Sequence, residues 1–126
     1  MTVTASTFDL VWSRDEGTCV RCGAALVGAR GLSWSVHHRR PRSMGGSKLA
    51  WVDRPGNLIL LCGSGTTGCH GWVESHRAFA RGLGFLVSAN GQRKPVEVAI
   101  HHALHGLVLL NDLGGPDGFD SQEVPF

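Results

Sequence analysis

The chain has 126 residues, a net charge of +2, 18 glycines and no tyrosine. This length suits one domain with a modest core and is too short for two. The first ten residues contain neither a basic residue nor a sustained apolar run, and no stretch is long enough to span a bilayer. We therefore expect a soluble cytoplasmic protein without a membrane partner.

Charge is unevenly distributed along the chain. Residues 14–54 contain eight Arg or Lys and three acids, whereas residues 111–126 contain four acids and no base. A basic half suits a polyanionic partner such as nucleic acid, although a merely solvated surface explains the same count. We expect one domain over residues 1–110, with its core at about 17–83, followed by an acidic, flexible tail over 111–126.

The first half of the chain predicts a helix and one or two strands. Apolar positions between residues 7 and 16 have helical spacing, and Gly17 ends the run. Residues 32–36 alternate apolar with polar side chains, which predicts a strand or an extended arm of a hairpin. The polar stretch 41–54 is rich in turn-forming residues and predicts a surface loop.

The second half predicts another strand, a helix and a less certain pair of elements. The apolar run 57–62 follows Pro-Gly and predicts the second arm of the hairpin. Residues 69–82 predict one helix ended by glycine. Residues 95–110 suit either a buried helix or two short strands around Gly106, and we favour strands. The expected fold class is α+β.

Four cysteines have the pattern of a structural zinc site. Cytosolic reductants keep thiols reduced, so thiolate metal ligands are favoured over disulfides. Cys19 and Cys22 have the spacing of a zinc knuckle, and Cys62 and Cys69 would complete a tetrahedral sulfur shell. Six residues separate the second pair instead of the usual two to four, which a glycine-rich loop can accommodate. Free buried thiols are the alternative.

A second group of residues lies between or beside the cysteines: His37-His38, Asn57 and His70. In this order the chain resembles the HNH nuclease family, whose ββα-metal motif carries a histidine pair on the first arm, an asparagine on the second and a histidine on the helix. The resemblance covers roughly residues 19–82. It rests on His37-His-Arg-Arg-Pro-Arg-Ser-Met-Gly-Gly46, Asn57-Leu-Ile-Leu-Leu-Cys62 and Gly68-Cys-His-Gly-Trp-Val-Glu74.

The resemblance implies a metal-dependent endonuclease that hydrolyses DNA phosphodiester bonds. By analogy, His38 is the general base, His37 and His70 are metal ligands, and Asn57 fixes the arm or orients the base. The implied cofactors are one structural zinc and one catalytic divalent ion: Mg²⁺, Mn²⁺, Ni²⁺ or Zn²⁺. Adjacent strand residues point to opposite faces, so the roles of His37 and His38 could be exchanged.

The chain departs from the family pattern at two places. A four-residue insertion lengthens the segment before His70, and Glu74 stands where some members have a second helix histidine. On a continuous helix, Glu74 shares a face with His70 and can approach the same ion, whereas His76 lies on another face and is interpreted as a packed side chain.

Several basic residues flank the expected site or lie on the His70 face of the helix. They predict contacts to the sugar-phosphate backbone, with weak sequence preference on double-stranded DNA. Small relatives often sit beside phage packaging genes, so the resemblance also implies a possible terminase partner and a bacterial host cytoplasm. The expected contact residues are Arg39, Arg40, Arg42, Lys48, Arg77 and Arg81.

Two other functions fit parts of the pattern. A non-catalytic zinc-ribbon module that binds DNA explains the cysteines and arginines but leaves the histidines and Asn57 unused. A thiol oxidoreductase using Cys19 and Cys22 is disfavoured because no thioredoxin-like βαβ pattern surrounds them. A second histidine cluster has no acidic or cysteine partner beside it and is left unassigned: His101, His102 and His105.

Overall fold

The computed structural model describes residues 3–41, 50–88 and 93–118. It has mixed helix and strand, as expected for an α+β protein. Among the described helices, none has both the length and the apolar character needed to cross a membrane. The helices are α1 (Ala5–Asp15), α2 (Gly68–Ser75) and α3 (Arg77–Leu83), with 3-10 helices η1 (Ala50–Asp53), η2 (Pro55–Asn57) and η3 (Pro95–Glu97); the strands are β1 (Trp34–His38), β2 (Leu58–Cys62), β3 (Ile100–His102), β4 (Gly106–Leu110) and β5 (Pro116–Gly118).

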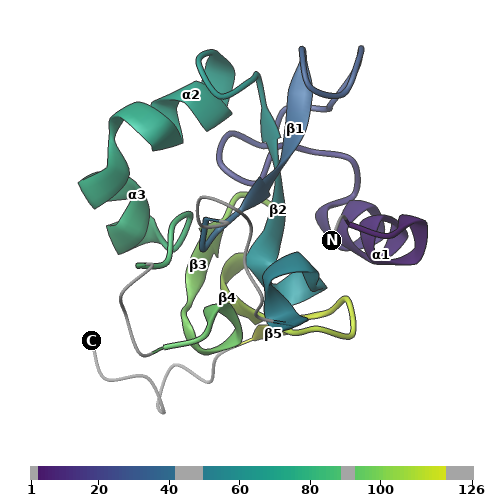
Figure 1. Ribbon diagram of the computed structural model, residues 1–126, viewed down its shortest axis with the longest axis vertical. Helices are drawn as coiled ribbons and strands as arrows, with labels where there is room; N and C mark the ends of the chain where they lie inside the picture. Colours follow the sequence, from purple (N-terminus) through teal and green to yellow (C-terminus); the bar gives the residue numbers. More distant parts are fainter. Residues whose placement is uncertain (1–2, 42–49, 89–92, 119–126) are drawn as a thin grey trace.

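The antiparallel pair β1–β2 forms the centre of the fold (Figure 1). Leu58 to Leu61 are all fully buried, because helices α1 and α2 both pack on β2. In Figure 1 the two helices lie on opposite sides of this strand. A strand covered on both faces has no polar side, which explains its uninterrupted apolar sequence. The register sets His37 opposite Ile59 and His38 opposite Leu58. The predicted hairpin is therefore confirmed.

Helix α1 forms close to its predicted position. The Thr4 hydroxyl accepts a hydrogen bond from the Thr7 amide at 3.2 Å and caps the first turn. The helix ends where Glu16 and Gly17 both take the left-handed conformation, with φ of 53° and 63°. Val11 is fully buried in the core beside β2.

The single helix predicted over residues 69–82 is instead two helices that meet at His76. The His76 backbone has φ −126° and ψ 52°, which is not helical. Its Nδ1 and the Ser75 hydroxyl both hydrogen-bond the Trp72 carbonyl, at 3.0 Å and 3.2 Å. The His76 ring also stacks on Trp72, with centroids 4.9 Å apart and planes 13° apart. Local side-chain bonds thus end α2 before α3 begins.

A three-stranded sheet in the order β3-β4-β5 packs below the hairpin in Figure 1. This confirms the preference for strands over residues 95–110. The sheet also corrects the expected start of a flexible tail at residue 111, because Pro116 to Gly118 pair with Leu110 to Val108. Strand β5 thus adds to the free edge of β4 as the third strand of the sheet. Residues 119–126 lie outside the described residues.

A buried charge cluster joins α1 to both sheets. The Asp15 carboxylate accepts hydrogen bonds from the Arg14 guanidinium at 2.8 and 2.9 Å, from His102 Nε2 at 2.8 Å and from the Leu60 amide at 3.1 Å. Burial alone would raise the pKa of Asp15, but the hydrogen bonds from His102 and Arg14 outweigh it and lower that pKa. The carboxylate therefore stays charged and paired inside the fold.

Replacing Asp15 should strongly destabilise the protein. Asp15→Asn keeps the shape but leaves the buried Arg14 without its counter-charge, a change that costs about 3–5 kcal/mol in comparable buried pairs. We expect a correspondingly lower free energy of unfolding in urea. Asp9→Asn, at an exposed position of the same helix, is the matched control and should change it by less than about 0.5 kcal/mol. Equal stability of the two variants would contradict this account.

Candidate functional site

The four cysteines converge on one point, as their spacing predicts. Their sulfur atoms all lie within 4.8 Å of one another. Cys22 and Cys62 are the most accessible of the four, and their sulfurs are 3.9 Å apart. Four sulfurs bound to one zinc at about 2.3 Å would lie roughly 3.8 Å from each other. The donor set and its spacing therefore fit a tetrahedral metal ion.

Local backbone geometry aims the first pair of sulfurs. Gly23 has a φ of 79°, and its amide donates to the Cys19 carbonyl at 2.8 Å, which closes a tight turn. The Cys22 amide points at Cys19 Sγ, 3.5 Å away. The turn is anchored to the core because the Val20 amide donates to the Leu60 carbonyl of β2 at 2.9 Å.

Two glycines explain how six residues can separate Cys62 from Cys69. Gly63 has a φ of 85°, and a Cβ there would lie 2.0 Å from the Thr67 carbonyl oxygen. Gly68 has a φ of 60°, and a Cβ there would lie 2.8 Å from the Cys62 carbonyl oxygen. The two ends of the loop thus touch backbone to backbone, which only glycine permits. The inserted residues loop out while the cysteines stay together.

Arg21 lies against the sulfur cluster. Its guanidinium donates to Cys69 Sγ at 3.3 Å and stacks 3.7 Å above the centre of the Trp72 ring. Burial raises the pKa of Cys69 and also that of Cys19. These thiols therefore hold their protons more tightly than exposed ones, and a bound metal ion would compensate the charge of the buried thiolates.

A second group of donor atoms is formed by His37 of β1 with His70 and Glu74 of α2. His37 Nδ1 and His70 Nε2 are 3.3 Å apart, and Glu74 Oε1 is 4.0 Å and 3.9 Å from them. Two nitrogens bound to one ion at about 2.0–2.1 Å would be separated by roughly 3.0–3.4 Å. The predicted ligand residues are thus brought together, and their spacing fits one divalent ion.

The partners of the two histidines orient their rings. His37 Nε2 lies 2.9 Å from the Phe85 carbonyl, which can only accept, so Nε2 is protonated and Nδ1 carries the lone pair. The Ser35 hydroxyl lies 3.1 Å from the Gly63 carbonyl and 2.7 Å from His70 Nδ1. When this hydroxyl donates to the carbonyl, it accepts from His70 Nδ1, and His70 Nε2 then presents its lone pair beside His37 Nδ1.

The two facing nitrogens are suited to bind a metal ion because both histidines are neutral near pH 7. Burial, together with the neighbouring His70, lowers the pKa of His37 to about 3. Burial also lowers the pKa of His70. A metal ion satisfies both nitrogens, and the bonds to Phe85 and Ser35 have the orienting role that outer partners have in metal sites.

His38 lies beside these ligands but outside the ligand group. It lines an open hollow of about 310 Å³, called the hollow below. His37, His70, Glu74 and Arg77 line this hollow as well. Its Nε2 is 2.8 Å from Asp53 Oδ1 of η1. Of the two adjacent histidines, His37 is thus the one placed to hold an ion, and His38 is placed beside it. Asp53 was not predicted, because nothing in the local sequence links residues 38 and 53.

The Asn57 side chain holds the backbone that follows β1 through hydrogen bonds. Its Oδ1 accepts from the Arg40 amide at 2.7 Å, and its Nδ2 donates to the Arg40 carbonyl at 3.2 Å and the Val52 carbonyl at 2.8 Å. The side chain is buried, with 1% of its surface exposed. Asn57 therefore ties the residues after His38 to η1, the helix that carries Asp53.

Arg39, expected to contact phosphate, is instead fully buried. Its guanidinium donates to four backbone carbonyls, those of Gly84, Gly56, Pro95 and Val98, at 2.7–3.0 Å. Burial lowers its pKa to about 9. With every arm of the guanidinium engaged inside the fold, Arg39 is a structural residue, and its assignment to nucleic-acid contacts is withdrawn.

The other basic residues remain on the surface where the structure describes them. The Arg40 guanidinium lies 5.0 Å from the centre of the Trp51 ring, and Arg77 pairs with Glu74 at 2.8 Å. Arg81 is exposed. Arg42 and Lys48, expected on the same surface, lie outside the described residues.

The remaining histidines have structural surroundings. His102 belongs to the Asp15 cluster, and His105 Nε2 donates to the Arg14 carbonyl at 2.7 Å. His101 is exposed on β3, and His76 stacks on Trp72 away from the ligand group.

Comparison of the chain with protein-family models, with curated proteins and with solved structures found no match. Its chemistry is therefore inferred from geometry.

The sulfur cluster predicts a structural zinc that the fold needs. The purified protein should contain one tightly bound zinc per chain by elemental analysis, and Cys62→Ser should lose it and lower the melting temperature by several degrees. The reason is that Cys62 and Cys69 join β2 and α2 to the turn at Cys19. A Cys62→Ser protein with unchanged zinc content and melting temperature would contradict a four-cysteine site.

Proposed function

We propose that this protein is a metal-dependent endonuclease of the HNH type, which hydrolyses DNA phosphodiester bonds with His38 as general base. The observation that carries the proposal is the pair of imidazole nitrogens, from His37 and His70, that lie 3.3 Å apart beside the Glu74 carboxylate. A third histidine, His38, borders the same hollow. A structural zinc alone would use neither feature.

Each residue of the hollow has a separate task. His37, His70 and Glu74 would hold one divalent ion, which stabilises negative charge on the phosphate and on the leaving oxygen. The His38 Nε2 proton is engaged by the Asp53 carboxylate, so Nδ1 is the atom that accepts a proton from the attacking water. Asp53 then stabilises the imidazolium that forms.

Basic residues around the hollow suit a DNA substrate. Arg77 borders the hollow, half-buried Arg40 follows His38 by two residues, and Arg81 is exposed on α3. Such contacts position a phosphate backbone without reading its sequence, so double-stranded DNA with weak sequence preference is the proposed substrate. A role in phage DNA packaging beside a terminase stays a prediction from the family resemblance.

A non-catalytic zinc-ribbon module is the alternative. It would account for the sulfur cluster and for surface arginines. It gives no reason, however, for the two outer bonds that aim His37 and His70 at one point. We therefore favour the nuclease.

The nuclease proposal is tested by incubating supercoiled plasmid with the protein and Mg²⁺, Mn²⁺, Ni²⁺ or Zn²⁺. At least one metal should support nicking or linearisation, and His38→Ala should reduce the rate by roughly 100-fold or more, because a general base contributes about 10²–10⁴. Zinc content and melting temperature should not change.

His101→Ala is the matched control, since His101 is an exposed histidine on β3 and lies outside the hollow. It should cleave at the wild-type rate. Full cleavage by a His38→Ala protein would exclude His38 as the base. Absence of cleavage by the wild-type protein with every metal, despite bound zinc, would favour the binding module.

Replacing Asp53 should slow cleavage without loss of metal. Asp53→Asn can present an amide N–H to His38 Nε2 and so place the imidazole proton on the wrong nitrogen, which should lower kcat by roughly 10- to 100-fold. Metal affinity, measured by calorimetry, should stay within about twofold because Asp53 is not in the ligand group. Asp9→Asn is the control. An unchanged kcat would remove Asp53 from the mechanism.

A further inference from the structure

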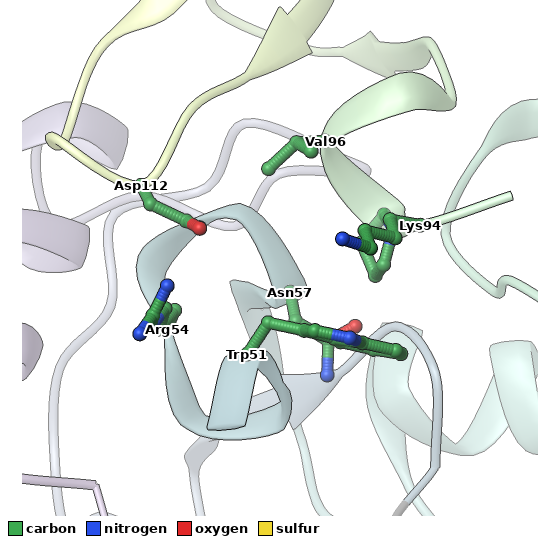
Figure 2. Close-up of a pocket in the computed structure, with 7 residues that line it drawn as sticks. Trp51, Arg54, Asn57, Lys94, Val96 and Asp112 are labelled. Atoms are coloured by element: carbon green, nitrogen blue, oxygen red, sulfur yellow. The ribbon is translucent and has the colours of Figure 1, made fainter. Parts of the chain in front are cut away.

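A second cavity lies beside the hollow and has no role in the proposed chemistry. Its volume is about 130 Å³. Figure 2 shows its labelled residues arranged around a common space, with Asp112 and Val96 on one side and Trp51 and Asn57 on the other. It is lined by Trp51, Arg54, Asn57, Lys94, Pro95, Val96 and Asp112.

The 3-10 segments connect this cavity to His38. Asp53 bonds His38, while Trp51 and Arg54, on either side of Asp53 in the sequence, line the cavity. Asn57 lines it as well and also holds the Arg40 backbone, two residues after His38. The segment that lines this cavity is therefore tied to His38 and to the backbone that follows it.

The lining combines an aromatic ring with two positive charges. Trp51 is half-buried, whereas Arg54 and Lys94 are exposed. In Figure 2 the Trp51 indole is seen close to edge-on below Lys94 and Val96, so that a ring face borders the space. One Asp112 oxygen accepts from the Gly56 amide at 3.0 Å. The outer part of the cavity therefore carries more positive than negative charge.

These features fit a nucleotide better than other ligands. Aromatic faces stack on bases of any sequence, and exposed cations hold the adjoining phosphate. The volume is well below the roughly 300–1,000 Å³ typical of drug-sized ligands, which suits a single ring system and not a base pair. In a duplex each base face is covered by its neighbours, so only an unpaired base can reach Trp51.

We propose that this cavity binds one unpaired nucleotide of the substrate strand, with its base on Trp51 and its phosphate between Arg54 and Lys94. The inference rests on the proposed nuclease function and deepens it. The substrate would be double-stranded DNA that has an unpaired nucleotide next to the cut: a gap, a flap or a branch.

The test is fluorescence anisotropy with a labelled 12-nucleotide single strand and the matching duplex, in the His38→Ala background without added divalent metal. Trp51→Ala should weaken single-strand binding by about 10-fold or more, because stacking contributes about 1–3 kcal/mol per base. Duplex binding should change by less than about twofold. Trp51→Phe keeps an aromatic face and should restore most of the affinity.

The two cations are tested by salt dependence. Arg54→Ala and Lys94→Ala should each reduce the slope of log K against log salt for the single strand by about 0.7, the value for one lost phosphate contact. Arg30→Ala is the control, because Arg30 is exposed, lies over Phe8 of α1 and lines neither cavity. Its slope should equal that of the His38→Ala background.

The outcomes separate this inference from the nuclease proposal. Equal single-strand affinity of the Trp51→Ala and parent proteins, with melting temperatures also equal, would overturn the nucleotide site even if plasmid cleavage depends on His38. Single-strand binding that depends on Trp51, without cleavage in any metal, would leave the nucleotide site standing and remove the nuclease. Weakening of single-strand and duplex binding by the same factor would also overturn it.

Discussion

Two buried arginines donate hydrogen bonds to carbonyls of the short segment 55–58, and the rest of the site depends on these bonds. Arg14 donates to the carbonyls of Pro55 and Leu58, and the side chain of Arg39 donates to that of Gly56. The Arg39 backbone amide donates a hydrogen bond to the Asn57 carbonyl at 2.7 Å. A segment buried this deeply must have its carbonyls paired. Because it is, Asn57 and the start of β2 are fixed, and with them the register of the His37 arm.

The parts of the site that the sequence predicted are those set by residue type and local spacing. Cysteines with C-x-x-C spacing have few chemical uses, so Cys19 and Cys22 could be grouped before their positions were known. His37 and His70 were grouped by the resemblance to the HNH family. The glycines at 63 and 68 made the long second cysteine spacing feasible. Apolar periodicity likewise predicted α1 and the β1–β2 pair, because burial selects that periodicity directly.

The parts that the sequence did not predict depend on contacts between distant segments. Strand alternation puts Arg39 on the same side as His37. The loops that pack on that side decide whether the Arg39 guanidinium binds backbone carbonyls or remains open to phosphates. Asp53 meets His38 only because η1 folds back toward β1. The break at His76 follows from a ring stack and from side-chain bonds to the Trp72 carbonyl, which helical propensity does not report.

The donor set of His37, His70 and Glu74 has a consequence for metal choice. Two imidazole nitrogens and one carboxylate are donors of intermediate softness, which favour Zn²⁺, Ni²⁺, Co²⁺ and Mn²⁺ over the hard, oxygen-seeking Mg²⁺. Affinity for such a donor set rises along the Irving–Williams order. An ion held by these residues in a cell would therefore be selected by the free concentrations that the cell maintains, and a change in transition-metal supply would change which ion the proposed site holds.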